Sequence, residues 1–447
     1  MSKLALFGGE PAITYKGTEL FDWPIVTKED EEAVLDTLRK RKMSGTDITM
    51  EFEKQWAEWS GVKYALGTCN GTAALHAAMY GIGLGKGDEI IAPTITYWAS
   101  CLGAMSLGAT VVFADVDDTT CIDPDKIEEK ITERTKAIMV VHHLAYPAKM
   151  DKIMAIAKKH NLKVIEDVSH AQGGLYKGQK VGTFGDVAAA SLMTGKSFAC
   201  GEAGILWTND LEIYERAIAF GTYERFGTPD SVETESLKPF AGLPLGGYKH
   251  RMHQLSSAMG IVQLKYYDER CAEIRKAHNY FGDLVEKGTN GAVWLMRCDE
   301  SEGSTMAGWY VPLMRYDASK VGGLSLTRFC EALTAEGFAS APGTYRPLHT
   351  HPVFAEAHIY NEDKPTRIAN SPVDIREMDK TITYANELNG TSFYGWWFKH
   401  FDKEVIEQFA NAVIKVYENY EELLEGDTGN QGELGGWHRF THDKKKK

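Results

Sequence analysis

The chain has 447 residues, 43% hydrophobic and 25% charged, with a formal net charge of -13 at neutral pH. These values are typical of globular proteins and exceed what a single core usually holds, so they exclude a disordered chain and predict about two or three domains. A negative surface repels polyanions, so nucleic acid is not expected as a partner despite the lysine run at 444–447.

The compartment is indicated by apolar runs and by cysteine usage. No apolar run approaches the roughly 20 residues of a membrane span, and the one at the N-terminus is too short for a signal peptide. The 7 cysteines are odd in number and scattered, without a Cys-x-x-Cys pair, which favours free thiols over disulfides or a zinc site. We therefore expect a soluble, cytoplasmic protein with no membrane partner.

The first part of the chain predicts an arm followed by two helices. Residues 1–25 show no regular pattern, and Thr27 with Asp30 has the spacing of a capping box before an apolar periodic stretch. Aromatic residues then recur at helical spacing over 52–59, which predicts a second helix with an aromatic face in the core.

Beyond this point, short apolar runs alternate with segments of helical length. The strand-like runs are 64–68, 89–92, 110–114, 137–141, 163–165, 187–192 and 204–207. The helical segments are 73–80, 97–106, 124–131 and 150–159. This alternation predicts an α/β domain with a mostly parallel sheet flanked by helices, in which ligands bind at the carboxyl ends of the strands.

A second, smaller domain is expected after two bridging helices. The bridging helices are predicted at 255–267 and 272–286, followed by a strand at 309–313 and helices at 326–335 and 405–417. The expected division is an N-terminal arm and helix over 1–45, a large domain over 46–270, a small α+β domain over 271–425 and a flexible tail over 426–447.

One lysine, Lys196, lies where a strand of small residues runs into a glycine-rich loop. A lysine held there can lose hydration and act as a nucleophile, as the Schiff-base lysine of a pyridoxal phosphate enzyme does. The alternatives are a structural lysine and a phosphate-binding loop, because Gly195-Lys196-Ser197 ends like a Walker A motif. Ala190 stands where that motif needs glycine, and the residues after Ser197 resemble a strand rather than a helix, which disfavours an NTPase.

Two other strand ends carry groups that suit the same cofactor. Gly71 and Thr72 open a helix, where unpaired N–H groups favour a phosphate, although Asn-Gly-Thr is also an ordinary turn. Asp167 ends a buried strand, where it could pair with a protonated pyridine nitrogen or cap the next segment. Together with Lys196, these groups match what pyridoxal phosphate requires.

Metal catalysis is not expected. His142 and His143 are adjacent, so on a strand they would face opposite sides and could not chelate one ion together. His349 and His351 could share a face, but no neighbouring cysteine or carboxylate completes a site.

Several motifs agree in order and spacing with one known family. They are Asn70-Gly71-Thr72-Ala73-Ala74-Leu75, Gly87-Asp88-Glu89-Ile90-Ile91-Ala92-Pro93, Asp115-Val116-Asp117, Glu166-Asp167-Val168-Ser169-His170, and Lys196 before Gly201-Glu202-Ala203-Gly204. Over nearly its whole length the chain resembles the DegT/DnrJ/StrS family of pyridoxal phosphate sugar aminotransferases. The resemblance implies the aspartate aminotransferase fold, fold type I.

The resemblance also implies a role for each site residue. Lys196 would carry the cofactor and move the proton between the amino donor and the cofactor. Asp167 would keep the pyridine nitrogen protonated, and His170 would contact the ring hydroxyl. The remaining implied contacts are Tyr97, which would stack on the ring, and Gly71, Thr72 and Ser191, which would bind the phosphate.

One motif departs from the family pattern. The usual Gly-Tyr-Asn-x-Arg-Met reads Gly247-Tyr248-Lys249-His250-Arg251-Met252 in this chain. The family's asparagine reaches the phosphate from the other subunit, so the motif implies a homodimer with shared active sites. Lys249 would replace the asparagine through its charge.

A lysine at position 196 favours transamination, because the dehydratase branch of the family replaces it. The implied reaction is ping-pong, with glutamate or glutamine as donor and a keto-sugar as acceptor, either nucleotide-linked or a cyclitol such as scyllo-inosose. The N-terminal sequence and the Trp396-Trp397 region favour a cyclitol, and Arg346 could meet an anionic acceptor group or form a surface ion pair. The alternatives are a sugar dehydratase and a non-catalytic, cofactor-binding regulator.

Overall fold

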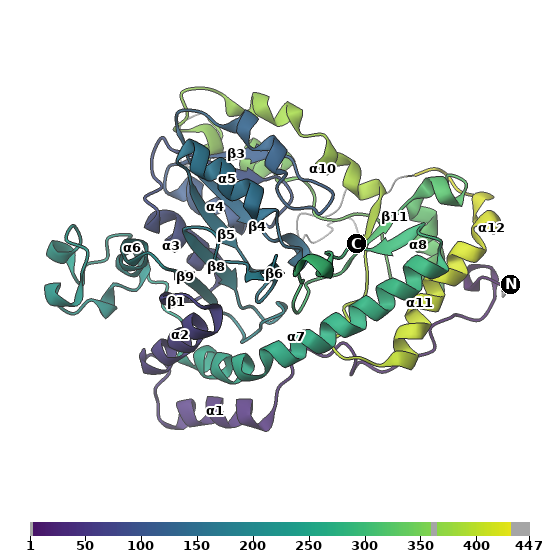
Figure 1. The fold of residues 1–447 in the computed structure, drawn as a ribbon, viewed down its shortest axis with the longest axis horizontal. Helices are drawn as coiled ribbons and strands as arrows, with labels where there is room; N and C mark the ends of the chain where they lie inside the picture. Colours follow the sequence, from purple (N-terminus) through teal and green to yellow (C-terminus); the bar gives the residue numbers. More distant parts are fainter. Residues whose placement is uncertain (1–2, 359–363, 431–447) are drawn as a thin grey trace.

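The computed structural model describes residues 3–358 and 364–430. Most of the predicted tail, with the lysine run 444–447, lies outside the described residues. The described part has a seven-stranded sheet with the strand order β1-β9-β8-β5-β4-β2-β3, shown at the centre of Figure 1. Its strands are β1 (Tyr64–Thr68), β2 (Glu89–Pro93), β3 (Thr110–Ala114), β4 (Thr135–Val141), β5 (Lys163–Asp167), β8 (Val187–Ser191) and β9 (Gly204–Thr208). All seven predicted strands are therefore confirmed.

The sheet is mostly parallel, as predicted. β2, β3, β4, β5 and β8 pair in parallel, whereas β9 pairs antiparallel with both β8 and β1. Parallel strands need a crossover between them, and the helices supply it. The flanking helices are α2 (Asp47–Ser60), α3 (Gly71–Gly81), α4 (Ala99–Ser106), α5 (Met150–His160) and α6 (Leu211–Gly221).

The alternation of side chains along each strand explains why helices cover both faces. In β2, Ile90 and Ala92 belong to the hydrophobic core shared with α3, α4 and α6, whereas Ile91 belongs to the core shared with α5. All three side chains are buried. A strand that buries both faces reads as a continuous apolar run, which is the pattern that predicted it.

The predicted helix at 124–131 is wrong. The chain forms two 3-10 turns instead, Pro124–Lys126 and Glu128–Lys130. The cause is a tertiary contact, because the Lys130 side chain is buried and its ammonium donates to the carbonyl of Met378 at 2.5 Å and to Thr381 Oγ1 at 2.6 Å. The apolar periodicity within residues 124–131 cannot predict a contact with a segment about 250 residues away.

The two bridging helices are one helix, α7 (Gln254–Gly288), of 35 residues. No glycine or proline interrupts 268–271, so nothing ends the helix where the apolar pattern weakens. Figure 1 shows α7 running from α2 (Asp47–Ser60) to α11 (Lys403–Glu418), and α1 (Lys28–Arg39) packs on its first half. α1 begins at the predicted capping box, in which Thr27 and Asp30 each accept a backbone N–H from the other.

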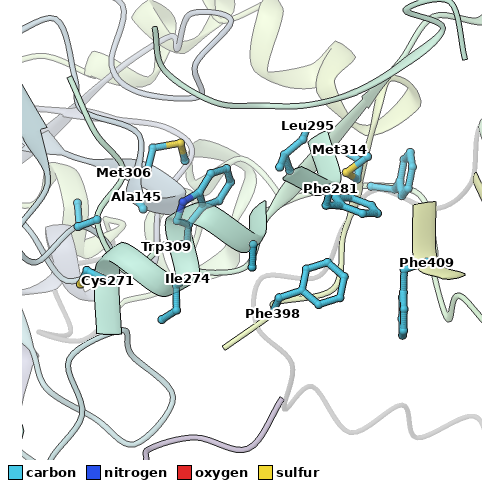
Figure 2. Close-up of a cluster of buried hydrophobic side chains, with 14 of the residues drawn as sticks. Ala145, Cys271, Ile274, Phe281, Leu295, Met306, Trp309, Met314, Phe398 and Phe409 are labelled. Carbon is cyan, nitrogen blue, oxygen red and sulfur yellow. The ribbon is translucent and has the colours of Figure 1, made fainter. Parts of the chain in front are cut away.

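A second sheet lies at the far end of α7. Its antiparallel strands are β10 (Val293–Leu295), β11 (Leu313–Tyr316) and β12 (Ser392–Tyr394). Helices α8 (Leu326–Ala335), α11 and α12 (Tyr420–Leu424) accompany it. In Figure 2, Phe281 of α7 packs with Leu295, Met314 and Phe398, which are all buried, so this sheet and α7 share one core.

The strand predicted at 309–313 begins only at Leu313. Trp309 and Val311 have φ values of 58° and 46°, a left-handed conformation that a strand cannot contain. Pro312 also lacks the N–H group that a central strand would use. Residues 309–312 therefore form an irregular segment that enters the candidate site described below.

The segments 348–358 and 364–388 pack against the first sheet. Leu348, Phe354 and Ile382 join the core of α3 and α4, and Arg367 donates to the carbonyl of Val111 in the edge strand β3 at 2.7 Å. The short helices here are α9 (Pro352–Ala355) and α10 (Tyr384–Glu387), and a small hairpin, β6 (Leu175–Tyr176) with β7 (Gln179–Lys180), follows β5.

The domain boundaries stay predictions. Within the described ranges, no helix has the length and apolar composition that crossing a membrane requires.

Candidate active site

The predicted carboxylate, Asp167, is the last residue of β5 and is buried. Its Oδ2 accepts a hydrogen bond from Ser100 Oγ at 2.7 Å, and its Oδ1 accepts one from the backbone N–H of Ser169 at 3.0 Å. These two donors fix the orientation of the carboxylate at the carboxyl edge of the sheet. Such a buried acid is ready to receive a cation.

The neighbouring acid, Glu166, serves the structure instead. Its side chain accepts backbone N–H groups from Gly182, Phe184 and Gly185 at 2.6–2.8 Å, and it lies 3.0 Å from His142 Nε2. The pleat of β5 therefore sends one acid to each face of the sheet. Only Asp167 of this pair faces the candidate site.

A cradle of N–H groups that suits an anion forms where α3 meets the end of β8. Asn70 Oδ1 accepts the N–H of Ala73 at 2.8 Å, which leaves the N–H groups of Gly71 and Thr72 directed in front of the helix. A Cβ added to Gly71 would lie 2.5 Å from the Cβ and 2.7 Å from the Cα of Ser191. Only glycine permits this approach, which places Gly71, Thr72 and Ser191 at one point.

Lys196 lies in the loop after β8, and its side chain is 9% exposed. Its backbone N–H donates to Met193 at 2.8 Å, and its carbonyl accepts from Trp23 Nε1 at 2.8 Å. Its Nζ lies 4.3 Å from the ring centroid of Tyr310, in the irregular segment before β11. Lys196 is thus held by its backbone hydrogen bonds, and its amine by an aromatic face.

The loop that carries Lys196 is anchored by buried hydrogen bonds. Gln172 donates to the carbonyl of Ser191 at 2.8 Å and accepts from Ser197 Oγ at 2.8 Å. Ser197 Oγ lies 2.9 Å from Tyr267 OH on α7, which also donates to the carbonyl of Gln172. This network joins the end of β8, the lysine loop and α7, so the position of Lys196 is set by more than one element.

His170 lies beside Lys196 and is buried. Its ring stacks on Tyr310 with a centroid distance of 4.1 Å, and its Nδ1 accepts the N–H of Leu144 at 3.3 Å. Burial, followed by the charge of Lys196, holds the pKa of His170 well below its usual range. A neutral imidazole that accepts at Nδ1 carries its proton on Nε2, so Nε2 is a hydrogen-bond donor.

Tyr97 is the most exposed aromatic group of the site, with 37% of its surface exposed. Its ring lies 5.2 Å from that of Trp98, at the start of α4. Partial burial raises the pKa of Tyr97, and Tyr310 adds to this effect, which places the two tyrosines near each other. An open aromatic face of this kind can stack on a planar ligand.

Within one chain, Lys249 does not join the other predicted site residues. It is exposed and forms an ion pair of 2.8 Å with Glu224. Its neighbours His250 and Arg251 pair with the end of β1, so the motif borders the sheet edge while its lysine points elsewhere.

Three groups near the site were missed by sequence reasoning, namely Ser100, Tyr310 and His143. The sequence patterns place Ser100 in a predicted helix and Tyr310 in a predicted strand. For His143 they raise only the question of metal binding. Across the described ranges, no cluster of three or more His, Cys, Asp or Glu residues could hold a metal ion. The glycine-rich and acidic motifs are recognisable in the sequence. The missed groups are not, because only tertiary contacts bring them to the site.

The buried histidines predict a specific pH dependence of stability. Burial is the main cause that lowers the pKa of His143 and of His278, each to about 3, and the pKa of His170 also falls. The folded chain keeps them neutral, whereas the unfolded chain binds protons below about pH 6.5. As the pH falls from 6.5 towards 4, each histidine should lower the free energy of unfolding by about 1.4 kcal/mol per pH unit.

Urea unfolding at a series of pH values measures this dependence. His278 stacks on Trp309 at 4.5 Å, in the core rather than in the candidate site, so His278→Phe keeps the ring and removes one titrating group. The slope of unfolding free energy against pH should fall by about 1.4 kcal/mol per pH unit in this variant. An unchanged slope would show that His278 does not titrate as described.

Taken together, the site offers a buried acid for a cationic ring nitrogen, an N–H cradle for a phosphate and a buried amine. These groups come from β5, from α3 with β8, and from the loop after β8. These are the kinds of group that a flat cofactor with a phosphate at one end and a protonated nitrogen at the other requires, as pyridoxal phosphate does.

Known proteins are similar to this chain in sequence and in fold. Residues 24–372 match the model of the DegT/DnrJ/EryC1/StrS aminotransferase family. A putative L-glutamine:3-amino-2,3-dideoxy-scyllo-inosose aminotransferase from Micromonospora echinospora is 31% identical, over 93% of this chain and 97% of that protein. GDP-perosamine synthase from Escherichia coli O157:H7 is 33% identical, over 78% of this chain and 91% of its own.

A solved structure agrees with the fold. The X-ray structure of an aminotransferase from Psychrobacter cryohalolentis superposes with a TM-score of 0.76 and 27% sequence identity. The match covers 90% of this chain and the whole of that one.

Proposed function

The chain belongs to the DegT/DnrJ/EryC1/StrS aminotransferase family, and from that premise we propose that it moves an amino group from glutamine or glutamate to a cyclitol ketone of the scyllo-inosose type. It is a pyridoxal-phosphate-dependent aminotransferase with the fold of the type I enzymes. The observation that carries the proposal is the meeting of Lys196, Asp167 and the start of α3 at adjacent strand ends.

We assign the central roles to Lys196 and Asp167. When bound, pyridoxal phosphate supplies an aldehyde that takes up the amino group and a ring that withdraws electrons from the reacting carbon. Lys196 Nζ would hold the cofactor and would move the proton at the reacting carbon. Asp167, oriented by Ser100 and Ser169, keeps the ring nitrogen protonated.

The other predicted residues bind the cofactor at its edges. The Nε2–H of His170 donates to the ring oxygen, because Leu144 occupies its Nδ1. Tyr97 stacks on the ring face. The N–H groups of Gly71 and Thr72, with Ser191, receive the phosphate at the positive end of the α3 dipole.

The proposed acceptor rests on the share of this chain that aligns with each relative. The aminotransferase for 3-amino-2,3-dideoxy-scyllo-inosose aligns with 93% of this chain, whereas GDP-perosamine synthase aligns with 78%. The longer match favours a cyclitol over a nucleotide-linked sugar. The name of the first relative also favours glutamine as the donor.

We further propose a homodimer that shares its active sites and works in the cytoplasm. All 7 cysteines are free, which suits a reducing compartment. The segment between α6 and α7 projects from the sheet (Figure 1), and it exposes Phe240, Leu243 and Leu245 by 47%, 51% and 38%. An exposed apolar patch of this kind suits an interface, and Lys249 on the same segment would then reach the partner's phosphate site.

The dimer is tested by placing charge in this patch. Leu243→Glu combined with Leu245→Glu should weaken self-association by more than about 100-fold, because an interface core excludes unpaired charge. Light scattering during gel filtration should show a mass near the 49.7 kDa of one chain for this variant, and twice that mass for the wild type. Val373→Glu, at another exposed apolar position, is the control and should stay dimeric. A monomeric wild type would contradict the proposal.

The aminotransferase assignment is tested by the visible absorbance of bound pyridoxal phosphate. Addition of glutamine or glutamate to the loaded protein should remove the band, and later addition of scyllo-inosose should restore it. A band that no donor changes would favour the regulatory or dehydratase alternatives. A protein that binds no pyridoxal phosphate would contradict the assignment of Lys196 and Asp167.

A further inference from the structure

His143 lies two residues after the end of β4, whose neighbour β5 ends in Asp167. The side chain is fully buried. Its Nδ1 lies 2.8 Å from Thr120 Oγ1, but its Nε2 has no hydrogen-bond partner among the described residues. A buried polar atom without a partner is costly, so it calls for an explanation.

The surrounding backbone holds this ring in place. Thr120 adopts φ 64° in a turn where its N–H donates to the carbonyl of Asp117 at 2.9 Å. Leu144 and Ala145, directly after His143, adopt φ values of 50° and 73°. Left-handed conformations at three non-glycine residues persist only where the fold enforces them, and they are typical of functional sites.

The free nitrogen lies next to the reacting groups. The two nitrogens of an imidazole point in largely opposite directions, so Nε2 is turned away from Thr120. The rings of His170 and Tyr345 lie 5.6 Å and 5.2 Å from the His143 ring. His170 in turn stacks on Tyr310, whose ring centroid lies 4.3 Å from Lys196 Nζ. After burial, the charge of Lys196 is the next cause that lowers the pKa of His143.

We propose that His143 determines acceptor specificity by forming a hydrogen bond from its Nε2 to a ring hydroxyl of the ketone acceptor, an inference that rests on the proposed function. A hydroxyl both donates and accepts, so it can pair with Nε2 in either tautomer, whereas a carboxylate can only accept. A polyhydroxylated ring carries such groups next to its carbonyl carbon. The charged amino donor has no equivalent group there.

The inference is tested by the two half-reactions of the loaded enzyme. His143→Phe keeps a ring of similar shape and removes both nitrogens. His278→Phe is the matched control, because His278 is equally buried and both of its nitrogens are without a partner among the described residues. In His143→Phe, the second-order rate constant with scyllo-inosose should fall about tenfold, while the reaction with glutamine stays unchanged.

A binding measurement gives an independent readout. Calorimetric titration with scyllo-inositol, a ring with hydroxyls but no ketone, should show about tenfold weaker binding to His143→Phe than to the wild type or His278→Phe. His143→Gln, which keeps a polar group, should recover part of the loss. The cofactor absorbance and melting temperature of each variant report whether it folds.

Several results would overturn the inference. These are an equal loss in the glutamine reaction, an equal loss in His278→Phe, or scyllo-inositol binding that His143→Phe does not weaken. Failure of the wild type to react with any donor would instead contradict the proposed function. The two failures are therefore distinguishable.

Discussion

Replacement of Lys196 by alanine is expected to lower kcat by about 10⁴-fold or more. The variant loses both the amine that holds the cofactor and the base that moves the proton, and each role alone supplies a large rate factor. The fold should survive, because the Lys196 side chain contributes mainly a contact with the face of Tyr310. Steady-state assays with glutamine and scyllo-inosose measure the loss.

Another lysine of the same sheet, Lys163, serves as the control for Lys196. Lys163 begins β5 at the opposite edge of the sheet and forms an ion pair with Asp186 at 2.7 Å. Lys163→Ala should keep wild-type kcat. In addition, borohydride reduction followed by peptide mapping should find the cofactor attached to Lys196 in the wild type. Activity of Lys196→Ala within tenfold of wild type would refute its assignment.

Asp167→Asn is expected to lower kcat by about 10²- to 10⁴-fold. The substitution keeps the size of the side chain and an oxygen for the N–H of Ser169, but it removes the charge opposite the ring nitrogen. Loss of one partner from a buried ion pair costs about 3–5 kcal/mol, which corresponds to this range of rates. Single-turnover measurements with glutamine, at saturating cofactor, isolate this effect.

The adjacent acid provides a matched comparison. Glu166 accepts three backbone N–H groups and does not face the candidate site. Glu166→Gln should therefore lower the melting temperature while the loaded, folded fraction keeps its kcat. If Glu166→Gln lowered kcat as much as Asp167→Asn, the separation of roles between the two faces of β5 would be wrong.

The sequence predicted those parts of the fold that local patterns determine. Every strand of the large sheet is a run of apolar residues, because both faces are covered by helices. The capping box at Thr27 was predicted by its spacing, and Gly71 was predicted from the turn that opens α3. In each case the cause of the structure lies within a few residues of the feature.

The errors occur where distant contacts decide the structure. The turns at 124–130 follow from the burial of Lys130 against Met378 and Thr381. The segment at 309–312 takes left-handed conformations instead of a strand, and it carries Tyr310 to Lys196. No periodicity within these segments reports such contacts.

The candidate site shows the same division. Motifs pointed to Asp167 and Ser191, which end strands, and to Lys196 and Gly71, which lie a few residues after strands. The groups that orient or surround them come from elsewhere in the chain, such as Ser100 on α4 and His143 after β4. Their roles at the site can be inferred only from the folded structure, in which the strand ends lie side by side. The role of Lys249 depends on a second chain and stays a prediction.

The most direct test of the central claim is the transfer of nitrogen itself. The enzyme loaded with pyridoxal phosphate would be incubated with scyllo-inosose and L-glutamine labelled with ¹⁵N at the α-amino group, and the products analysed by mass spectrometry. We predict an amino-cyclitol that carries the label, and no such product with Lys196→Ala. Label that stays in glutamine, or a ketone consumed without gaining nitrogen, would contradict the proposed aminotransferase function.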